Sequence, residues 1–212
     1  MRILSIRNRN AAAVAIASLV AVMTSGAAAA GTSNTDPTAE FVVFVNELHV
    51  DAPTAAALTS RFDALSADEQ RAFLETATTN PLAVVEFEDD VEPTVKPAAP
   101  PTYAGIQTWT ATYPVTVSVL GIDTGTFSLS YTFQGTSIST TKNLECRGWF
   151  SGFAGFWSIS STSSNYISGS KGTCKVVHRM SAVYKGSFVT ANKEQSITFA
   201  GPTLIEKYTR NV

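Results

Sequence analysis

Residues 146–157 read Cys146-Arg147-Gly148-Trp149-Phe150-Ser151-Gly152-Phe153-Ala154-Gly155-Phe156-Trp157, the densest aromatic run in the chain. The run begins at one of only two cysteines, and the other is Cys174. Two cysteines in an exported protein have a single intramolecular pairing, so we expect a Cys146–Cys174 disulfide. Closing a loop of about 29 residues stabilises a fold by roughly 3.5 kcal/mol in the loop-entropy model. That is a large share of the roughly 5–15 kcal/mol net stability of a typical domain.

The aromatic run is compatible with two kinds of secondary structure. As a strand, it would have apolar rings on both faces, with Trp149, Phe153 and Trp157 on the same one. As a helix, it would have a single aromatic stripe with helical spacing, interrupted by the glycines of the run. Periodicity does not decide between the two.

The rings can serve either as core or as an exposed surface. Aromatic side chains bury large areas and dominate protein cores, which favours the first role. Interleaved glycines let a ligand approach the backbone, and residues 158–173 are rich in Ser, Thr and Gly. These features favour a platform for sugar rings, a membrane interface or a protein partner. The candidate binding residues are Trp149, Phe153, Trp157, Arg147 and Lys171.

Residues 1–30 have the three regions of a secretory signal peptide. Arginines at positions 2, 7 and 9 precede an uncharged apolar segment, and the region ends in Ala28-Ala29-Ala30. The apolar segment is short for a membrane span of about 20 residues, which argues against an uncleaved anchor. We therefore expect cleavage near Ala30 and a secreted protein with no transmembrane segment in the mature chain.

Residues 31–92 predict an acidic helical segment. Three stretches have apolar residues at helical spacing, and the second follows Asp51-Ala52-Pro53, with its proline in the first turn. The third begins with Ser66 and has Glu69 three residues later, the pattern of a capping box.

Charge is distributed unevenly along the chain. Residues 31–98 contain 13 acidic and 3 basic residues, whereas residues 99–212 contain 4 acidic and 9 basic residues. The opposite charges either draw the two parts together or only keep each part soluble.

A cluster of carboxylates within residues 86–92 is followed by a proline-rich linker, residues 93–102. The carboxylate spacing matches no calcium-binding loop and lacks the central glycine, which favours a solvated acidic face or linker over a metal site. Four prolines between Pro93 and Pro101 indicate an extended, semi-rigid linker and the best domain boundary in the sequence.

From residue 103 onward the hydrophobic pattern has a period of two, which is typical of strands. Residues 113–119 and 126–133 alternate on either side of a glycine-containing link and predict a hairpin. Further strands are predicted at residues 175–189, 195–199 and 203–208. The fold class is therefore α+β and mainly β. We expect a small acidic helical N-terminal segment, followed over residues 103–212 by an antiparallel β-sandwich or small barrel with one disulfide.

The sequence has no constellation that predicts a reaction. It contains no Gly-x-Ser-x-Gly elbow, zinc spacing, P-loop or dinucleotide fingerprint. Of its two histidines, His49 lies in a predicted helix and His178 in a predicted strand, where we expect a packed structural residue. We therefore expect no catalytic residue, no metal and no cofactor, and an interaction protein rather than an enzyme.

The basic residues of the C-terminal part lie around the disulfide-bracketed loop and have aromatic neighbours. Such a mixture suits anionic polymers, lipid headgroups or a protein surface, and the export signal argues against nucleic acid. We expect a secreted, non-enzymatic binding protein of the kind bacteria export, whose partner is a cell-envelope component or another protein. The alternative is a secreted precursor or effector in which the acidic N-terminal half is a pro-segment that masks a basic β domain.

Overall fold

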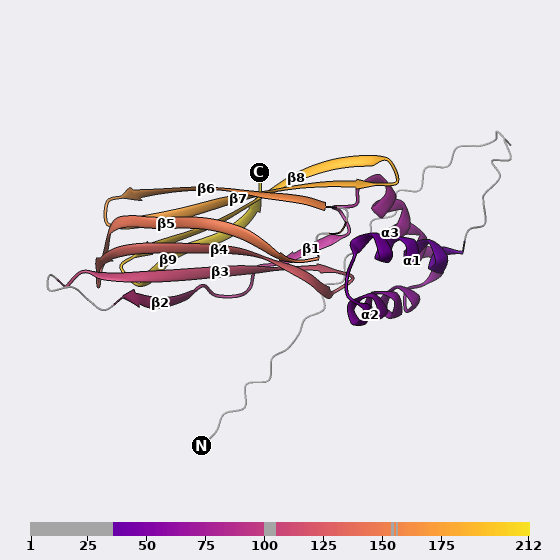
Figure 1. Cartoon of the computed structure of the whole chain (residues 1–212), viewed down its shortest axis with the longest axis horizontal. Helices are drawn as coiled ribbons and strands as arrows, with labels where there is room; N and C mark the ends of the chain where they lie inside the picture. The colour runs from indigo at the N-terminus through magenta and orange to yellow at the C-terminus, as the bar shows by residue number, and fades with distance from the viewer. Residues whose placement is uncertain (1–35, 100–104, 154, 156) are drawn as a thin grey trace, which may run out of the picture. The chain divides into compact units, whose positions relative to one another are not determined.

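The computed structural model describes residues 36–99, 105–153, 155 and 157–212. The fold is mainly β, with three helices followed by two antiparallel sheets (Figure 1). All of the described residues belong to one compact unit. The signal peptide predicted for residues 1–30 lies outside the described residues.

The three helices are α1 (Pro37–Leu48), α2 (Ala52–Asp63) and α3 (Ala67–Thr79). Each begins after a residue whose side chain accepts a hydrogen bond from a backbone N–H of the first turn, namely Asp36, Asp51 and Ser66. At α3 the cap is reciprocal, because Glu69 Oε2 also accepts from the backbone N–H of Ser66 at 2.8 Å. Caps of this kind each stabilise a helix by about 1 kcal/mol.

The helices pack around phenylalanine rings and continue that packing onto a strand. The rings of Phe41 and Phe62 stack with their centroids 4.0 Å apart. Phe44 meets Tyr184 edge-on at 5.4 Å, and Tyr184 lies at the end of strand β7. A three-helix unit of this size has a small core of its own, so the contact with β7 adds to its stability.

The first sheet contains β1 (Val85–Glu88), β2 (Thr94–Ala99), β3 (Gln107–Val119), β4 (Ile122–Thr136) and β5 (Ser139–Gly152). β3, β4 and β5 pair in chain order, and the hairpin predicted from the alternating pattern is β3–β4. β1 and β2 both pair with β3, with Val85 opposite Val119 and Thr94 opposite Thr112. They therefore lie end to end along one edge of β3.

The sequence predicted a helical segment over residues 31–92 and a linker over residues 93–102, whereas residues 85–88 form β1 and residues 94–99 form β2. The backbone of residues 94–99 is extended, as a proline-rich linker would be, but it is also hydrogen-bonded to β3. An edge strand tolerates proline because one side of its backbone needs no partner in the sheet. The same composition therefore fits a linker and an interrupted edge strand.

The second sheet contains β6 (Trp157–Ser168), β7 (Lys171–Tyr184), β8 (Ser187–Ala200) and β9 (Thr203–Asn211), paired in chain order. The single strand predicted across residues 175–189 is wrong, because a tight turn at Lys185 and Gly186 separates β7 from β8. The φ angles of Lys185 and Gly186 are 46° and 83°. A two-residue hairpin turn with both φ values positive usually contains Asn-Gly or Asp-Gly. Lys185 stands at the first position here, so the sequence lacks the pattern that would have predicted the turn.

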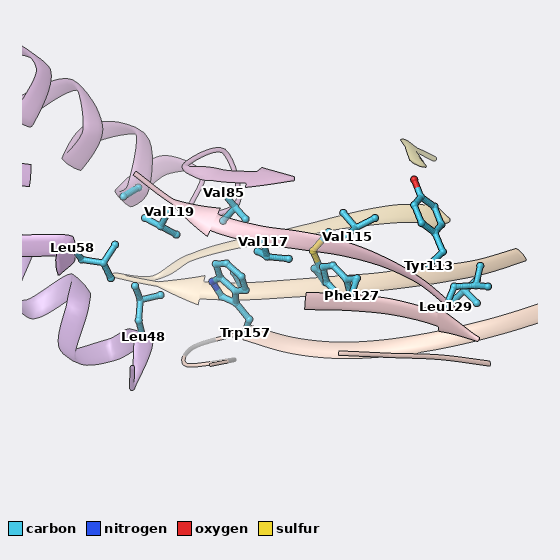
Figure 2. Packing of buried hydrophobic residues seen from close by; sticks show 14 of the residues in the cluster. Leu48, Leu58, Val85, Tyr113, Val115, Val117, Val119, Phe127, Leu129 and Trp157 are labelled. Carbon is cyan, nitrogen blue, oxygen red and sulfur yellow. The ribbon is translucent and has the colours of Figure 1, made fainter. Parts of the chain in front are cut away.

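The two sheets pack face to face in a sandwich-like arrangement over an apolar core (Figure 2). Inward side chains of β3, β4 and β7 fill it, among them Tyr113, Val115, Val117, Phe127, Leu129 and Val176, all with 0% exposure. The predicted disulfide is confirmed: Cys146 of β5 is bonded to Cys174 of β7, with the Cα atoms 5.6 Å apart. The bond joins one sheet to the other.

Trp157 closes the end of this core that meets the helices. It belongs to the same buried cluster as Leu48 of α1 and Leu58 of α2, which Figure 2 shows on the helix side of the core, and only 6% of the residue is exposed. Nearby, the backbone at Gly155 runs so close to Leu48 that a Cβ on Gly155 would lie 2.6 Å from Leu48 Cα. Gly155, which lies between β5 and β6, is therefore packed tightly against the end of α1.

Replacing Trp157 with alanine should lower the free energy of unfolding by about 3–5 kcal/mol, the usual result of removing a large aromatic side chain from a core. The matched control is Trp149→Ala, because Trp149 is 38% exposed. That change should cost about 1 kcal/mol or less. Denaturant unfolding monitored by circular dichroism measures both, and equal losses would contradict this assignment of the two tryptophans.

Candidate binding surface

The described residues of the aromatic run include the end of β5, up to Gly152, and the start of β6, at Trp157. Gly148 and Phe150 point into the sandwich, whereas Arg147 and Trp149 alternate with them and point outward. A Cβ at Gly148 would lie 2.2 Å from Val176 Cγ1, so β5 packs against β7 at a distance that only glycine allows. The outward residues therefore stand on a strand with little freedom to shift.

Arg147 and Trp149 form the one part of the predicted site that the structure brings together. The guanidinium carbon of Arg147 lies 5.3 Å from the centroid of the Trp149 ring. Such a contact contributes about 0.5–1 kcal/mol at an exposed position. Arg147 Nε is also 3.7 Å from Glu145 Oε1, but both side chains are more than half exposed, so water screens this pair. In the sheet, Trp149 stands opposite Ser128 of β4.

The other predicted residues lie elsewhere. Trp157 is in the core, and Phe153 is half-buried, with its backbone N–H donating to the carbonyl of Thr124 at 2.9 Å. Lys171 is exposed at the start of β7, opposite Ser168, at the other end of β6 from Trp157. The intervening strand is roughly 36 Å long at about 3.3 Å per residue. Lys171 therefore belongs to a different part of the surface.

The strand interpretation placed Trp149, Phe153 and Trp157 on one face, but the backbone does not remain extended between them. Gly152 has φ of 134° and Gly155 has φ of 50°, and the chain turns there from the first sheet to the second. Glycine adopts such angles without the steric cost that other residues have. The period of two is lost at this turn. Trp149 of β5 therefore faces outward, whereas Trp157 of β6 lies in the core.

His178 lies in the core with both ring nitrogens hydrogen-bonded. Nδ1 is 2.8 Å from Ser161 Oγ, and Nε2 is 2.7 Å from Gln195 Oε1. The amide nitrogen of Gln195 donates to the carbonyl of Tyr113, so its oxygen accepts from Nε2–H and the hydroxyl of Ser161 donates to Nδ1. Burial lowers the pKa of His178, against an opposing effect of the Gln195 hydrogen bond, and so favours the neutral ring.

The described part of the chain offers no cluster of three or more His, Cys, Asp or Glu side chains that could hold a metal ion. None of its helices has the length and apolar character needed to cross a bilayer.

A cleft of about 530 Å³ between β1 and β8 was not foreseen from the sequence. Phe87 and Lys193 line it, although they are more than 100 residues apart in the chain. They meet only because the two sheets are stacked. The available signal was Lys193 itself, a charged residue at an inward position of a period-two strand, in register with the buried His178.

No protein-family model, no curated protein sequence and no solved structure matches this chain.

The free energy of unfolding should rise as the pH increases through about 6.5, because unfolded histidine has a pKa of about 6.5. With a lower pKa in the folded state, His178 binds fewer protons there than in the unfolded chain. Its contribution to stability is present above the unfolded pKa and is lost as the pH falls. His178→Gln keeps hydrogen-bonding groups but cannot titrate. Urea unfolding at several pH values around 6.5 should show a smaller dependence of the unfolding free energy on pH for this variant than for the wild type. An unchanged dependence would contradict a lowered pKa of His178 in the folded state.

Proposed function

We propose that the protein is a secreted, non-enzymatic binding module that holds an anionic glycan of the cell envelope through Arg147 and Trp149. The observation that carries this proposal is the Arg147 guanidinium placed 5.3 Å from the Trp149 ring, with both side chains directed outward from β5. The secreted location rests on the signal-like residues 1–30 and on the disulfide, since such bonds persist mainly in oxidising compartments.

The two side chains suit two different parts of a charged sugar. An exposed indole face packs against the C–H groups of a sugar ring and buries apolar area while the ring hydroxyls stay hydrated. A guanidinium recognises carboxylate or phosphate with two parallel hydrogen bonds, and it keeps its planar fork while resting on an aromatic ring. The pair therefore combines shape selection with charge selection.

The strand that carries the pair is already ordered before a ligand arrives. Cys146, directly before Arg147, is bonded to β7, and Gly148, directly after it, packs on Val176. A rigid strand loses little conformational entropy on binding, so more of the contact energy appears as affinity. The excess of 9 basic over 4 acidic residues in 99–212 also favours an anionic partner.

The precursor hypothesis draws on ion pairs between the acidic and basic parts of the chain. Lys185 pairs with Glu40, and Lys207 pairs with Glu92 at 3.0 Å and donates to the carbonyl of Val91 at 2.9 Å. A masking pro-segment would make such contacts. However, cleavage within residues 93–102 would also detach β1 and at least part of β2 from β3. We therefore favour a docked acidic helical segment that stays with the β domain.

Retention on a purified anionic cell-wall polysaccharide tests this function, with a neutral glucan as the comparison polymer. Trp149→Ala and Arg147→Ala should each weaken binding to the anionic polymer by about fivefold or more, since residues that anchor an interface cost upward of about 1 kcal/mol when truncated. Tyr166→Ala is the matched control, because Tyr166 is an exposed aromatic residue (47%) near a lysine, Lys175, on the second sheet.

The proposal requires that Tyr166→Ala binds as the wild type does and that all variants unfold at similar denaturant concentrations. An equal loss of polysaccharide binding in all three variants would show that the protein adheres to the polymer nonspecifically. Unchanged binding in Trp149→Ala and Arg147→Ala would remove this surface as the site.

A further inference from the structure

The cleft between β1 and β8 has the size and lining of a small-molecule site. Its volume of about 530 Å³ lies within the range of roughly 300–1,000 Å³ that is usual for ligand pockets. The wall is mixed: Leu82, Val85, Phe87, Met180 and Val189 give it an apolar part, and Asn80, Thr190, Asn192 and Asn211 give it a polar part beside Lys193. β1 and β5 lie at opposite edges of the first sheet, so the cleft is separate from the Arg147–Trp149 surface.

Lys193 brings a positive charge into this mixed wall. Its Nζ lies 4.2 Å from the centroid of the Phe87 ring and donates to Asn211 Oδ1 at 3.2 Å. Within the described residues no carboxylate comes within ion-pair distance of Lys193, and Asp89 acts on it only from farther away. An ammonium group has three N–H donors, so the contacts with Asn211 and Phe87 leave capacity for another acceptor.

A half-buried ammonium without a paired carboxylate is unfavourable, because the contacts with Asn211 and Phe87 replace only part of the hydration that burial removes. The lowered pKa of Lys193 has this cause, since burial outweighs the opposing attraction of Asp89. An anion placed in the cleft would supply the missing counter-charge. A single monoanion matches the single cation, whereas a dianion would leave one charge unpaired in the cleft.

We propose that the cleft binds a small amphipathic carboxylate, with its carboxylate against Lys193 Nζ and its hydrocarbon chain along Phe87, Leu82 and Met180. The charge-assisted hydrogen bond orients the ligand, and burial of the chain supplies most of the affinity. The apolar part of the lining selects against small hydrophilic acids. The site is thus a second binding function, independent of the envelope-glycan surface.

Octanoate is the probe, and 1-octanol and octylammonium provide the same chain length with a neutral and a positive head. Isothermal titration calorimetry on the full-length mature protein should give octanoate at least tenfold tighter binding than 1-octanol and no binding of octylammonium. Lys193→Met keeps most of the length and the apolar stem of the side chain, and circular dichroism checks that the variant is folded. It should weaken octanoate binding at least tenfold and leave 1-octanol binding unchanged.

Lys142→Met, which changes an exposed lysine on β5, is the matched control and should bind octanoate as the wild type does. In ¹³C-dimethyl-lysine spectra, octanoate should raise the pKa of Lys193. Absence of octanoate binding at millimolar concentration would overturn the proposal. So would equal affinity for octanoate and 1-octanol, or equal losses in Lys193→Met and Lys142→Met.

Discussion

The disulfide between Cys146 and Cys174 holds β5 against the second sheet. The outward position of Trp149 on β5 follows from this bond. β5 is an edge strand with backbone pairing only to β4 among the described strands. Its other contacts reach across to the second sheet, where Asn143 Nδ2 donates to Asn165 Oδ1 at 3.0 Å and the N–H of Thr140 donates to the carbonyl of Ser170 at 2.8 Å. These contacts and the disulfide fix which side of β5 faces outward.

The acidic N-terminal part completes the sandwich rather than standing apart from it. α1 and α2 cover the end of the core at Trp157, and β1 and β2 occupy an edge of β3 that would otherwise present free backbone groups. Pairing with β1 and β2 satisfies those groups, and Pro97 on the new edge hinders pairing with another chain. The N-terminal part also helps to form the cleft, because Phe87 of β1 lines it in contact with Lys193. The same segment therefore contributes to both stability and the proposed ligand site.

Sequence patterns predicted the features whose causes are local. Period-two alternation identified the β3–β4 hairpin, a Ser66–Glu69 box agrees with the start of α3, and the cysteine count predicted the disulfide. Features that depend on register between distant strands were missed. Trp149 and Trp157 lie in one short run, yet one is exposed and the other buried, because the chain changes sheet between them. The Phe87–Lys193 contact has no local signature, since it exists only after the sheets stack.

The central claim is that the disulfide keeps β5 ordered and so presents Arg147 and Trp149 in a fixed arrangement. Hydrogen exchange of the β5 amides tests it most directly, in the disulfide-bonded protein and in the Cys146→Ala/Cys174→Ala double variant under native conditions. We predict that the amides of residues 146–150 exchange at least tenfold faster in the double variant, while the central amides of β8, in the middle of the second sheet, change much less. Equal exchange of β5 in the two proteins would show that packing alone orders this strand and would contradict the account.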